Sequence, residues 1–263
     1  MDDVEFKIDT IGEEVKVTYT VSEIRTLLPI LNFGGIEDNV WYQVGFTDNN
    51  WLGKGHTINT YYQNSDSRHS GEIFYSIPQL GKSRWGITGT LSRWASVEPL
   101  FFPGNVTVSY NYDFNNVGLT GIYQLQHNKK IEFGGSYFVE RYQKLESTSQ
   151  VELPGPDQLT QPKILARINY SEDYIRYFAY QQEGFAWTAF LNYVRNFNDN
   201  TNFTSLILQA KYFHMPNKLL NIAVRARFAI SDNDNSPFAP FVVDSHVNLR
   251  GVGNRIDLSL IHI

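Results

Sequence analysis

The sequence predicts an all-β protein whose antiparallel strands form a transmembrane β-barrel. From Leu220 to Ile230 apolar side chains alternate with a second set that includes Arg225 and Arg227. Because successive side chains of a strand point to opposite faces, one face of this segment is apolar and the other carries two guanidiniums. Aromatic residues reach 15% of the chain although the mean hydropathy is only −0.33, a combination that is typical of a barrel. No apolar run reaches the roughly 18 residues of a transmembrane helix.

The alternation also predicts which residues of this strand meet lipid. An arginine on the lipid face near the bilayer midplane costs roughly 2–4 kcal/mol, so two arginines in one strand favour a lumenal position for both. We therefore expect Arg225 and Arg227 to face the lumen. The residues expected to face lipid are Leu220, Ile222, Val224, Ala226 and Phe228.

The same period of two residues recurs along the chain and predicts eleven strands. Their expected ranges are Leu28–Gly34, Val40–Thr47, His56–Gln63, Glu72–Ile77, Trp85–Trp94, Val106–Leu125, Ile131–Tyr142, Ile164–Ser171, Phe185–Tyr193, Phe203–Tyr212 and Leu220–Ile230. Inside the longest of them, polar residues from Asp113 to Asn116 are expected to cause a bulge or a kink.

The first residues predict a smaller, separate unit. Val15 to Val21 alternates as one strand, and Val4 to Ile8 is its candidate partner across a turn at Thr10 to Glu13. Two strands alone are only marginally stable, so we expect this unit to be the remainder of a small α/β domain. Met1 to Glu5 has neither the basic nor the apolar region of a signal peptide, and we expect the chain to begin inside a longer gene product.

The lengths of the connections and the net charge favour an outer-membrane barrel and speak against a nucleic-acid-binding protein. Leu80–Ser83 and Gln126–Lys130 are short, whereas Glu146–Lys163 and Ser231–Asp257 are long and polar. Short turns at one end and long loops at the other are typical of outer-membrane barrels. A net charge of −5 with no cluster of Lys and Arg speaks against a nucleic-acid partner. The absence of cysteine excludes a disulfide framework and thiolate metal sites.

The sequence offers no recognisable catalytic or metal-binding constellation. Its 6 histidines show no ligand spacing, and no serine lies in a nucleophile-elbow motif. The Gly53-Lys54-Gly55 run lacks the context of a phosphate-binding loop. We therefore expect a protein that is not an enzyme and that needs no metal and no cofactor.

The tryptophans are expected to form an aromatic girdle. Trp41, Trp51, Trp85, Trp94 and Trp187 lie at or near the ends of predicted strands. Aromatic rings at these places mark the membrane–water boundaries of a barrel. A stacking platform for sugars or bases is the alternative.

Three motifs extend this interpretation. The segment Thr47–His56 contains Asn50, Trp51, Leu52, Gly53 and Gly55, and it resembles the "DNWLGxG" periplasmic turn between the second and third barrel strands of the BamA/TamA-type outer-membrane assembly (surface antigen) family. Leu249, Arg250, Gly251, Val252 and Gly253 resemble the "VRG(F/Y)" motif in the sixth surface loop of that family, with Leu249 in place of valine and Val252 in place of the aromatic residue. Val15–Leu28 resembles the closing strand of a POTRA repeat that runs into the first barrel strand.

The resemblance implies a barrel of which this chain holds about eleven of sixteen strands. Residues 1–27 would be the C-terminal remnant of a POTRA repeat, and residues 28–263 the N-terminal part of the barrel with its long sixth surface loop. The complete gene product is expected to carry a signal peptide, further POTRA repeats and about five strands beyond Asp257.

The resemblance also implies a function in the bacterial outer membrane, namely the assembly, insertion or translocation of membrane proteins. A weak seam strand, containing Phe33, Gly34 and Gly35, would receive incoming strands, because two glycines offer no side chain for packing. Arg250 would fold with its loop into the lumen and pair with an acidic residue of a later strand; a solvated loop arginine is the alternative. The expected partners are outer-membrane lipid, unfolded outer-membrane proteins and, as a further option, periplasmic or lipoprotein accessory subunits.

Other functions stay open at this point. A polypeptide-secretion pore or a lipid transporter of the same superfamily would share the barrel and its motifs. A passive porin-like channel would need neither the POTRA remnant nor the Leu249–Gly251 motif. A soluble β-sandwich would bury Leu220 to Ile230 against a second sheet.

Overall fold

The computed structural model describes residues 4–11, 14–21, 26–36, 39–102, 106–145, 154–178, 181–217 and 219–232. These ranges contain strands and no helix. The strands are β1 (Val4–Ile11), β2 (Glu14–Val21), β3 (Leu27–Ile36), β4 (Asn39–Trp51), β5 (His56–Ser65), β6 (Arg68–Ile77), β7 (Trp85–Phe102), β8 (Val106–Gln126), β9 (Lys129–Lys144), β10 (Gln158–Asp173), β11 (Arg176–Tyr177), β12 (Gln182–Asn196), β13 (Asn202–Asn217) and β14 (Leu220–Ser231). Over the same ranges, no helix has the length and apolarity that crossing a membrane requires.

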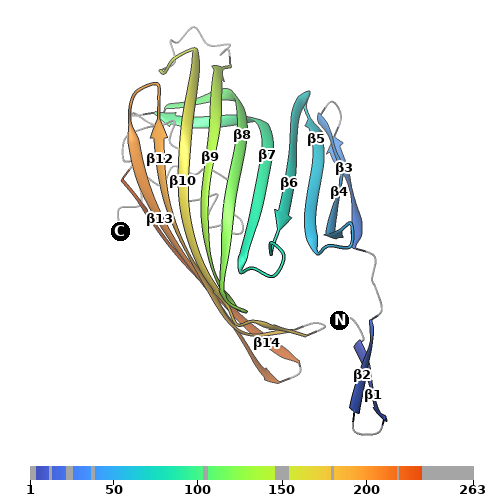
Figure 1. Ribbon diagram of the computed structural model, residues 1–263. Coiled ribbons are helices and arrows are strands. Elements are labelled where there is room, and N and C mark those ends of the chain that lie inside the picture. Colours follow the sequence, from blue (N-terminus) through green and yellow to red (C-terminus); the bar gives the residue numbers. More distant parts are fainter. Residues whose placement is uncertain are drawn as a thin grey trace.

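One large antiparallel sheet forms most of the molecule. From β3 to β14 each strand pairs with the next one along the chain, except that the two-residue β11 lies beside β12 and β10 pairs directly with β12. Figure 1 shows this sheet as strongly curved, with β3 and β14 as its two edges. The predicted all-β fold, a partial antiparallel barrel, is confirmed.

A separate hairpin precedes the sheet. β1 and β2 pair residue for residue from Val4↔Val21 to Ile11↔Glu14 and form a sheet of their own. The expected partnership of these two segments is therefore confirmed. In Figure 1 the hairpin lies below the end at which β3 begins. Its assignment to a POTRA repeat stays a prediction.

No bulge interrupts β8, although Figure 1 shows the upper part of the strand bending, so of the two expected forms the bulge is absent. Its 21 residues form one strand, which pairs with β7 without a register shift from Phe102↔Val106 to Trp85↔Tyr123. The polar residues remain in the strand because they bond to neighbours: Asp113 accepts from Arg93, and Asn116 donates to Ser92 at 3.3 Å. The register of β8 with β9 shifts only beside their turn, at Gln124/Gln126.

The two faces of the sheet differ in chemistry, as the alternation predicts. In β14, every residue of the expected apolar set is exposed, and Ile230 continues this face. Arg225 and Arg227 lie on the opposite, concave face, where they pair in register with Lys211 and Gln209. Arg227 Nε donates to Gln209 Oε1 at 2.8 Å. The convex face of this strand is thus apolar and the concave face polar.

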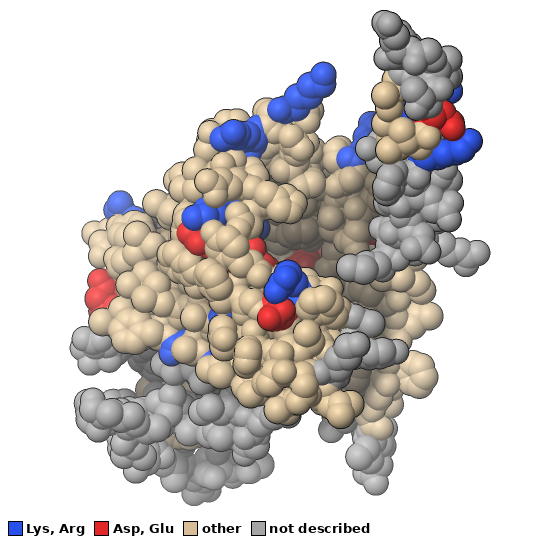
Figure 2. Space-filling view, turned by 90° about the horizontal axis from the view of Figure 1, so that it is seen from below, with Lys and Arg blue, Asp and Glu red and all other residues tan. Residues whose placement is uncertain are grey.

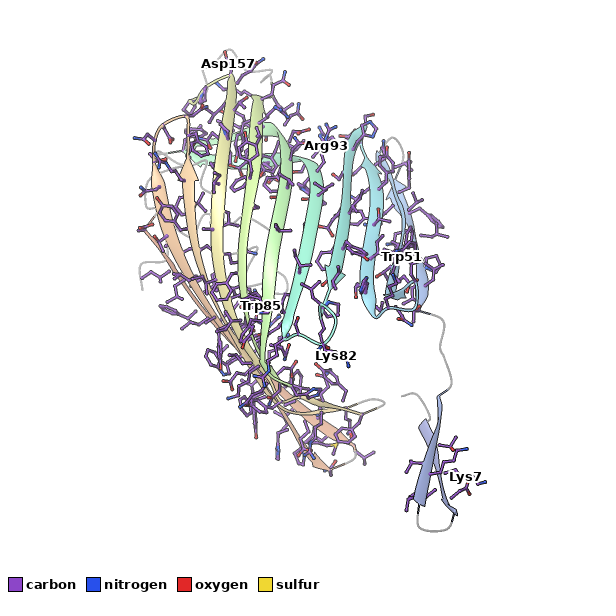
Figure 3. All side chains as sticks on the ribbon, viewed as in Figure 1. Lys7, Trp51, Lys82, Trp85, Arg93 and Asp157 are labelled. Carbon is purple, nitrogen blue, oxygen red and sulfur yellow. The ribbon has the colours of Figure 1, made fainter. Side chains whose placement is uncertain are left out.

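Aromatic rings gather on the lower part of the convex face. Ring pairs with centroid separations of about 5 Å join neighbouring strands: Trp85–Tyr123 at 4.8 Å, Tyr170–Trp187 at 5.1 Å and Tyr174–Phe185 at 4.8 Å. Figure 3 places Trp85 towards the lower end of the sheet and Arg93 towards the upper end. Figure 2, seen from below, shows uncharged residues over most of the visible described surface.

The girdle prediction is wrong for two of the five tryptophans. Trp41 is paired with Gly34, and a Cβ on Gly34 would meet its indole, so the two share the concave face. Trp94 lies in the middle of β7 and pairs with Phe114, which packs on the buried Phe138. Sequence position near a predicted strand end did not reveal the face, because β7 extends well beyond its predicted end.

The contrast between the faces leads to a first prediction. In lipid vesicles, Leu191→Arg on the convex face of β12 should lower the free energy of unfolding by roughly 2–4 kcal/mol, because it places a guanidinium in hydrocarbon. The control, Thr188→Arg, places the same group on the concave face of the same strand and should change that free energy far less. Urea titration of the vesicle-bound chain measures both. Equal effects of the two substitutions would contradict a lipid-facing convex surface.

Candidate functional site

The edge strand β3 is the first element of the candidate site. It pairs with β4 from Leu27↔Asp48 to Ile36↔Asn39, and no strand among the described residues pairs with its other side. Its outward side chains are also uncovered, since Leu31 is 70% and Phe33 84% exposed. A row of unpaired backbone N–H and C=O groups is a template on which a further strand can add.

At each of the two glycines near the end of β3, the structure disfavours a residue with a Cβ. A Cβ at Gly34 would lie 2.9 Å from Trp41 Nε1, so any side chain there would displace the indole. Gly35 has a φ of +130°, a conformation that residues with a Cβ rarely adopt. The predicted seam residues Phe33, Gly34 and Gly35 therefore lie together at the upper end of an open edge, and their role in a seam stays a prediction.

The turn after β4 brings the second predicted motif together. The Gly53 N–H donates to Asn50 O at 2.8 Å, and the Gly55 N–H donates to Asn50 Oδ1 at 2.7 Å. Leu52, Gly53 and Gly55 have positive φ values of 58°, 69° and 67°. Glycine adopts such angles at little cost, whereas leucine does so only when the surrounding bonds impose it.

The flanks hold this turn against the end of the sheet. Asp48, only 9% exposed, accepts from the Asn50 N–H at 2.8 Å. Trp51 stacks on Phe46 with 6.1 Å between ring centroids, and the turn leaves Leu52 at its tip, 71% exposed. The turn lies at the end of the sheet where β3 begins. The prediction that this end is periplasmic is not tested by its geometry.

The concave wall holds a buried ion pair that the sequence reading did not single out. Lys163 Nζ lies 2.5 Å from Glu140 Oε2, and the two side chains are 3% and 4% exposed. Tyr112 OH donates to the other carboxylate oxygen at 2.8 Å, so three neighbouring strands are joined at one point. The sequence feature that could have indicated this pair is the alternation of β9, which puts Glu132 and Glu140 on one face.

Apolar side chains enclose this ion pair. One buried cluster contains Leu100, Val108, Tyr110 and Tyr142, and a second contains Phe138, Val194 and Phe203. Tyr110 OH donates to the carbonyl oxygen of Pro156 at 3.0 Å. In Figure 1 the upper parts of β7 and β8 bend across the top of the sheet. These strands therefore lie across the end of the sheet opposite the Asn50–Gly55 turn.

Lower on the concave wall, polar side chains bond across the strands. Glu132 contacts Lys130 at 2.6 Å and also accepts from Asn169. Arg167 Nε donates to Asn192 Oδ1 at 2.7 Å, and Asn192 donates to Ser205 Oγ at 3.2 Å. Figure 2 shows the molecule hollowed when viewed from below. A polar wall of this kind suits contact with water or with a polar chain.

The remaining candidate residues are placed as follows. His56 and His69 each bond to a tyrosine hydroxyl at 2.7 Å. Within the described ranges, no three His, Cys, Asp or Glu side chains are grouped so as to hold a metal ion. Leu249, Arg250, Gly251, Val252 and Gly253 lie outside the described residues, so the predicted lumenal position of Arg250 stays a prediction.

Comparison with known proteins supports the fold. No model of a known protein family matches the chain, and no curated protein sequence matches it. Among solved structures, it is similar to the crystal structure of BamA from Haemophilus ducreyi lacking POTRA domains 1-3, with a TM-score of 0.55 and 13% sequence identity. The similarity covers 87% of this chain and 46% of that chain, so this chain spans less than half the length of its structural neighbour. At such low identity the likeness shows a BamA-like barrel fold and nothing finer.

The buried ion pair leads to a second prediction. Lys163→Met should lower the free energy of unfolding by about 3–5 kcal/mol, because it leaves the Glu140 carboxylate buried without a counter-charge. Adding Glu140→Gln should recover most of the loss. Arg176→Met, which breaks the exposed Arg176–Glu183 pair, should cost less than about 1 kcal/mol. Urea titrations of the unsubstituted protein and the three variants measure these free energies. An equal loss for Arg176→Met and Lys163→Met would contradict the prediction.

The turn leads to a third prediction. Gly53→Ala and Gly55→Ala should each lower the free energy of unfolding by about 1–2 kcal/mol. A Cβ at either glycine would meet no atom within 4 Å, so the loss comes from backbone strain alone. Leu52→Gly relieves strain of the same kind and should not destabilise the protein. The midpoint of thermal or urea unfolding measures these effects. A shift of that midpoint in the same direction and by a similar amount for Leu52→Gly and Gly53→Ala would disprove this explanation.

Proposed function

We propose that this chain is part of a bacterial outer-membrane β-barrel protein that assembles or inserts other membrane proteins, with its convex face in lipid. The observation that carries the proposal is the open edge of β3 on a curved sheet whose outer face is apolar. The likeness to a BamA barrel supports both the outer-membrane location and this class of activity. Neither depends on a catalytic group, and we propose no enzymatic activity.

The edge explains how such a protein would act. In hydrocarbon an unpaired backbone N–H or C=O group costs several kcal/mol, so an open edge in a membrane favours the addition of a strand. An incoming strand would pair with the free side of β3 through its main chain, which is β-augmentation. Main-chain pairing requires no particular sequence, and this suits a partner class as varied as unfolded barrel proteins.

The two glycines would keep this pairing reversible. Gly34 contributes no side chain to hold a neighbouring strand, and the positive φ of Gly35 ends the regular ladder. A partner strand is therefore held best along the lower part of β3, from Leu27 to Phe33. A strand bound over so few residues can be released once the new barrel closes.

The two ends of the sheet would serve different sides of the membrane. The hairpin β1–β2 and the Asn50–Gly55 turn belong to the end where β3 begins, and we assign this end to the periplasm. The hairpin would then be the last part of a POTRA repeat, which presents substrates and meets accessory subunits. Arg250 would fold with its loop into the lumen and pair with an acidic residue of a later strand.

The hollow supports a second candidate, a polypeptide-secretion pore on the same barrel. A wall of polar side chains, such as Arg167, Asn169 and Asn192, borders the concave face. Such a wall offers hydrogen bonds to a passing chain. The glycine-weakened end of β3 at Gly34 and Gly35 suits the exchange of partner strands, which favours assembly over a secretion pore or a passive channel.

Cross-linking at the edge provides the test. A photo-reactive residue at Leu31, on the edge strand, should capture a urea-unfolded barrel protein during its insertion into vesicles. The same residue at Val44, which pairs with Leu31 from the adjacent strand, is the matched control. We expect several-fold more adduct at Leu31, because among the described residues β3 has a free side whereas β4 is paired on both sides. Equal capture at the two positions, or none at Leu31 while insertion proceeds, would refute the assembly mechanism.

A further inference from the structure

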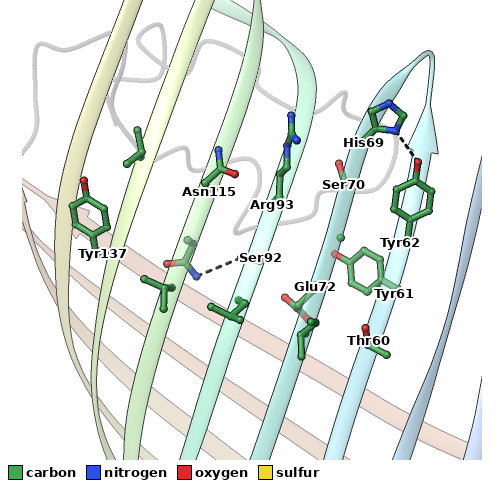
Figure 4. A pocket seen from close by; sticks show the side chains of 16 residues that line it. Thr60, Tyr61, Tyr62, His69, Ser70, Glu72, Ser92, Arg93, Asn115 and Tyr137 are labelled. Carbon is green, nitrogen blue, oxygen red and sulfur yellow. Dashed lines mark hydrogen bonds between the residues drawn. The ribbon is translucent and has the colours of Figure 1, made fainter.

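A groove opens on the convex face where β6 separates from β7. The two strands pair from Ile77↔Ile87 up to Gly71↔Arg93, and above this point the Ser70 hydroxyl accepts from the Ala95 N–H at 3.0 Å instead. A Cβ at Gly71 would lie 2.9 Å from the carbonyl oxygen of Tyr61, so the floor of the groove stays low at this residue. The groove is shallow and open to the outside, has a volume of about 670 Å³ and extends across β5 to β9. Figure 4 shows the side chains that line it.

The lining changes from apolar to polar along the groove. Ile73, Leu91 and Val117 lie side by side on adjacent strands, and each is about half exposed. One row higher, Arg93 and Asn115 occupy the corresponding positions. Figure 4 shows the Arg93 guanidinium pointing towards the end at which His69 lies. The groove is therefore an apolar channel with a polar, basic upper end.

The upper end carries more positive than negative charge. Asp113 accepts from Arg93 Nε at 3.1 Å and from Arg93 Nη2 at 2.6 Å, and Arg141 Nη1 lies 3.6 Å from its second oxygen. One carboxylate thus serves two guanidiniums. Both arginine side chains are more than half exposed, 54% and 57%. A guanidinium has five N–H donors, so each retains donors for a further anion.

We propose that this groove binds one acidic lipid, with the phosphate of its headgroup on Arg93 and Arg141 and an acyl chain along Ile73, Leu91 and Val117. The proposal rests on the function proposed above, since it requires the convex face to lie in lipid. Arginine binds phosphate through paired N–H groups and is the residue best suited to this ligand. Arg93 lies one position above Leu91 on the same face of β7, at the upper end of the groove, and Arg141 reaches it through their shared Asp113.

The shape and the charge together select this occupant. A volume of about 670 Å³ falls within the usual range of a small-molecule site and suits a hydrocarbon chain better than a folded partner. A zwitterionic lipid brings no net charge to the two arginines, and a phosphate without acyl chains would leave the apolar channel empty. Binding by an acidic lipid uses both parts of the groove.

The absence of native cysteine permits a direct experiment. A single cysteine at Val117, in the groove, carries a fluorophore, and Leu119→Cys on the same convex face, outside the groove, is the reference. The whole chain is reconstituted in phosphatidylcholine vesicles that contain a minor fraction of brominated phosphatidylglycerol or of brominated phosphatidylcholine. At position 117 we expect the acidic lipid to quench at least twofold more than the zwitterionic one, and at position 119 we expect equal quenching.

Two variants and one competitor test the parts of the site. Arg93→Gln should abolish the preference at position 117, whereas Arg176→Gln, which removes an exposed arginine outside the groove, should leave it unchanged. Ile73→Trp fills the channel and should also reduce the preference, although both arginines remain. Glycerol phosphate, which has no acyl chain, should not compete at the concentration of the brominated lipid. Persistence of the preference in Arg93→Gln, or full competition by glycerol phosphate, would overturn the proposal.

The failure of this inference can be told from the failure of the proposed function. Equal quenching by both lipids at both positions would mean that the convex face lies in lipid but that the groove has no acidic ligand. Absence of quenching at both positions would mean that the face does not lie in lipid, and both proposals would be overturned.

Discussion

In an apolar solvent every backbone N–H and C=O group must find its partner inside the protein, and the described strands are arranged in a way that meets this constraint. Apart from the two-residue β11, the meander from β3 to β14 pairs each strand with its neighbour, so that the internal strands are bonded on both sides. The same constraint makes the two ends of the meander exceptional. β3 and β14 keep one unbonded side each among the described residues, and the proposed function follows from that free side.

The continuous ladder also explains why the two faces are so different. Once strands are paired in register, side chains of like character align in rows across the sheet, as Ile73, Leu91 and Val117 do on the convex face. A single residue of slip would exchange the faces of a strand. The rows therefore reinforce one register. Along β7, Leu91 is followed on the same face by Arg93, and there the lining of the groove changes from apolar to polar.

The upper part of the sheet is stabilised differently from the lower part. Below, aromatic pairs on the convex face and polar bonds on the concave face join adjacent strands. Above, the long β7–β8 pair brings apolar side chains inward, and they pack around the ion pair of Lys163 and Glu140. A charge pair with this little exposure depends on its apolar surroundings and on Tyr112, so packing and electrostatics there are coupled.

Several features of this protein could be predicted from its amino-acid sequence alone. The eleven strands, the opposite faces of Val224 and Arg225, and the turn at Asn50–Gly55 all depend on interactions between residues close in sequence. Period-2 alternation and turn chemistry act over such short distances, and both are visible in a single sequence.

Only the tertiary structure decided the features that depend on pairing between distant residues. The continuity of β8 through Asp113 depends on Arg93, twenty positions away along the chain. The inward position of Trp94 and the contact of Lys163 with Glu140 depend on the register of strands that meet through the fold. The groove beside Gly71 exists because β6 and β7 stop pairing there. Polarity and alternation state which residues share a face, but register and the end of each ladder determine which of them meet.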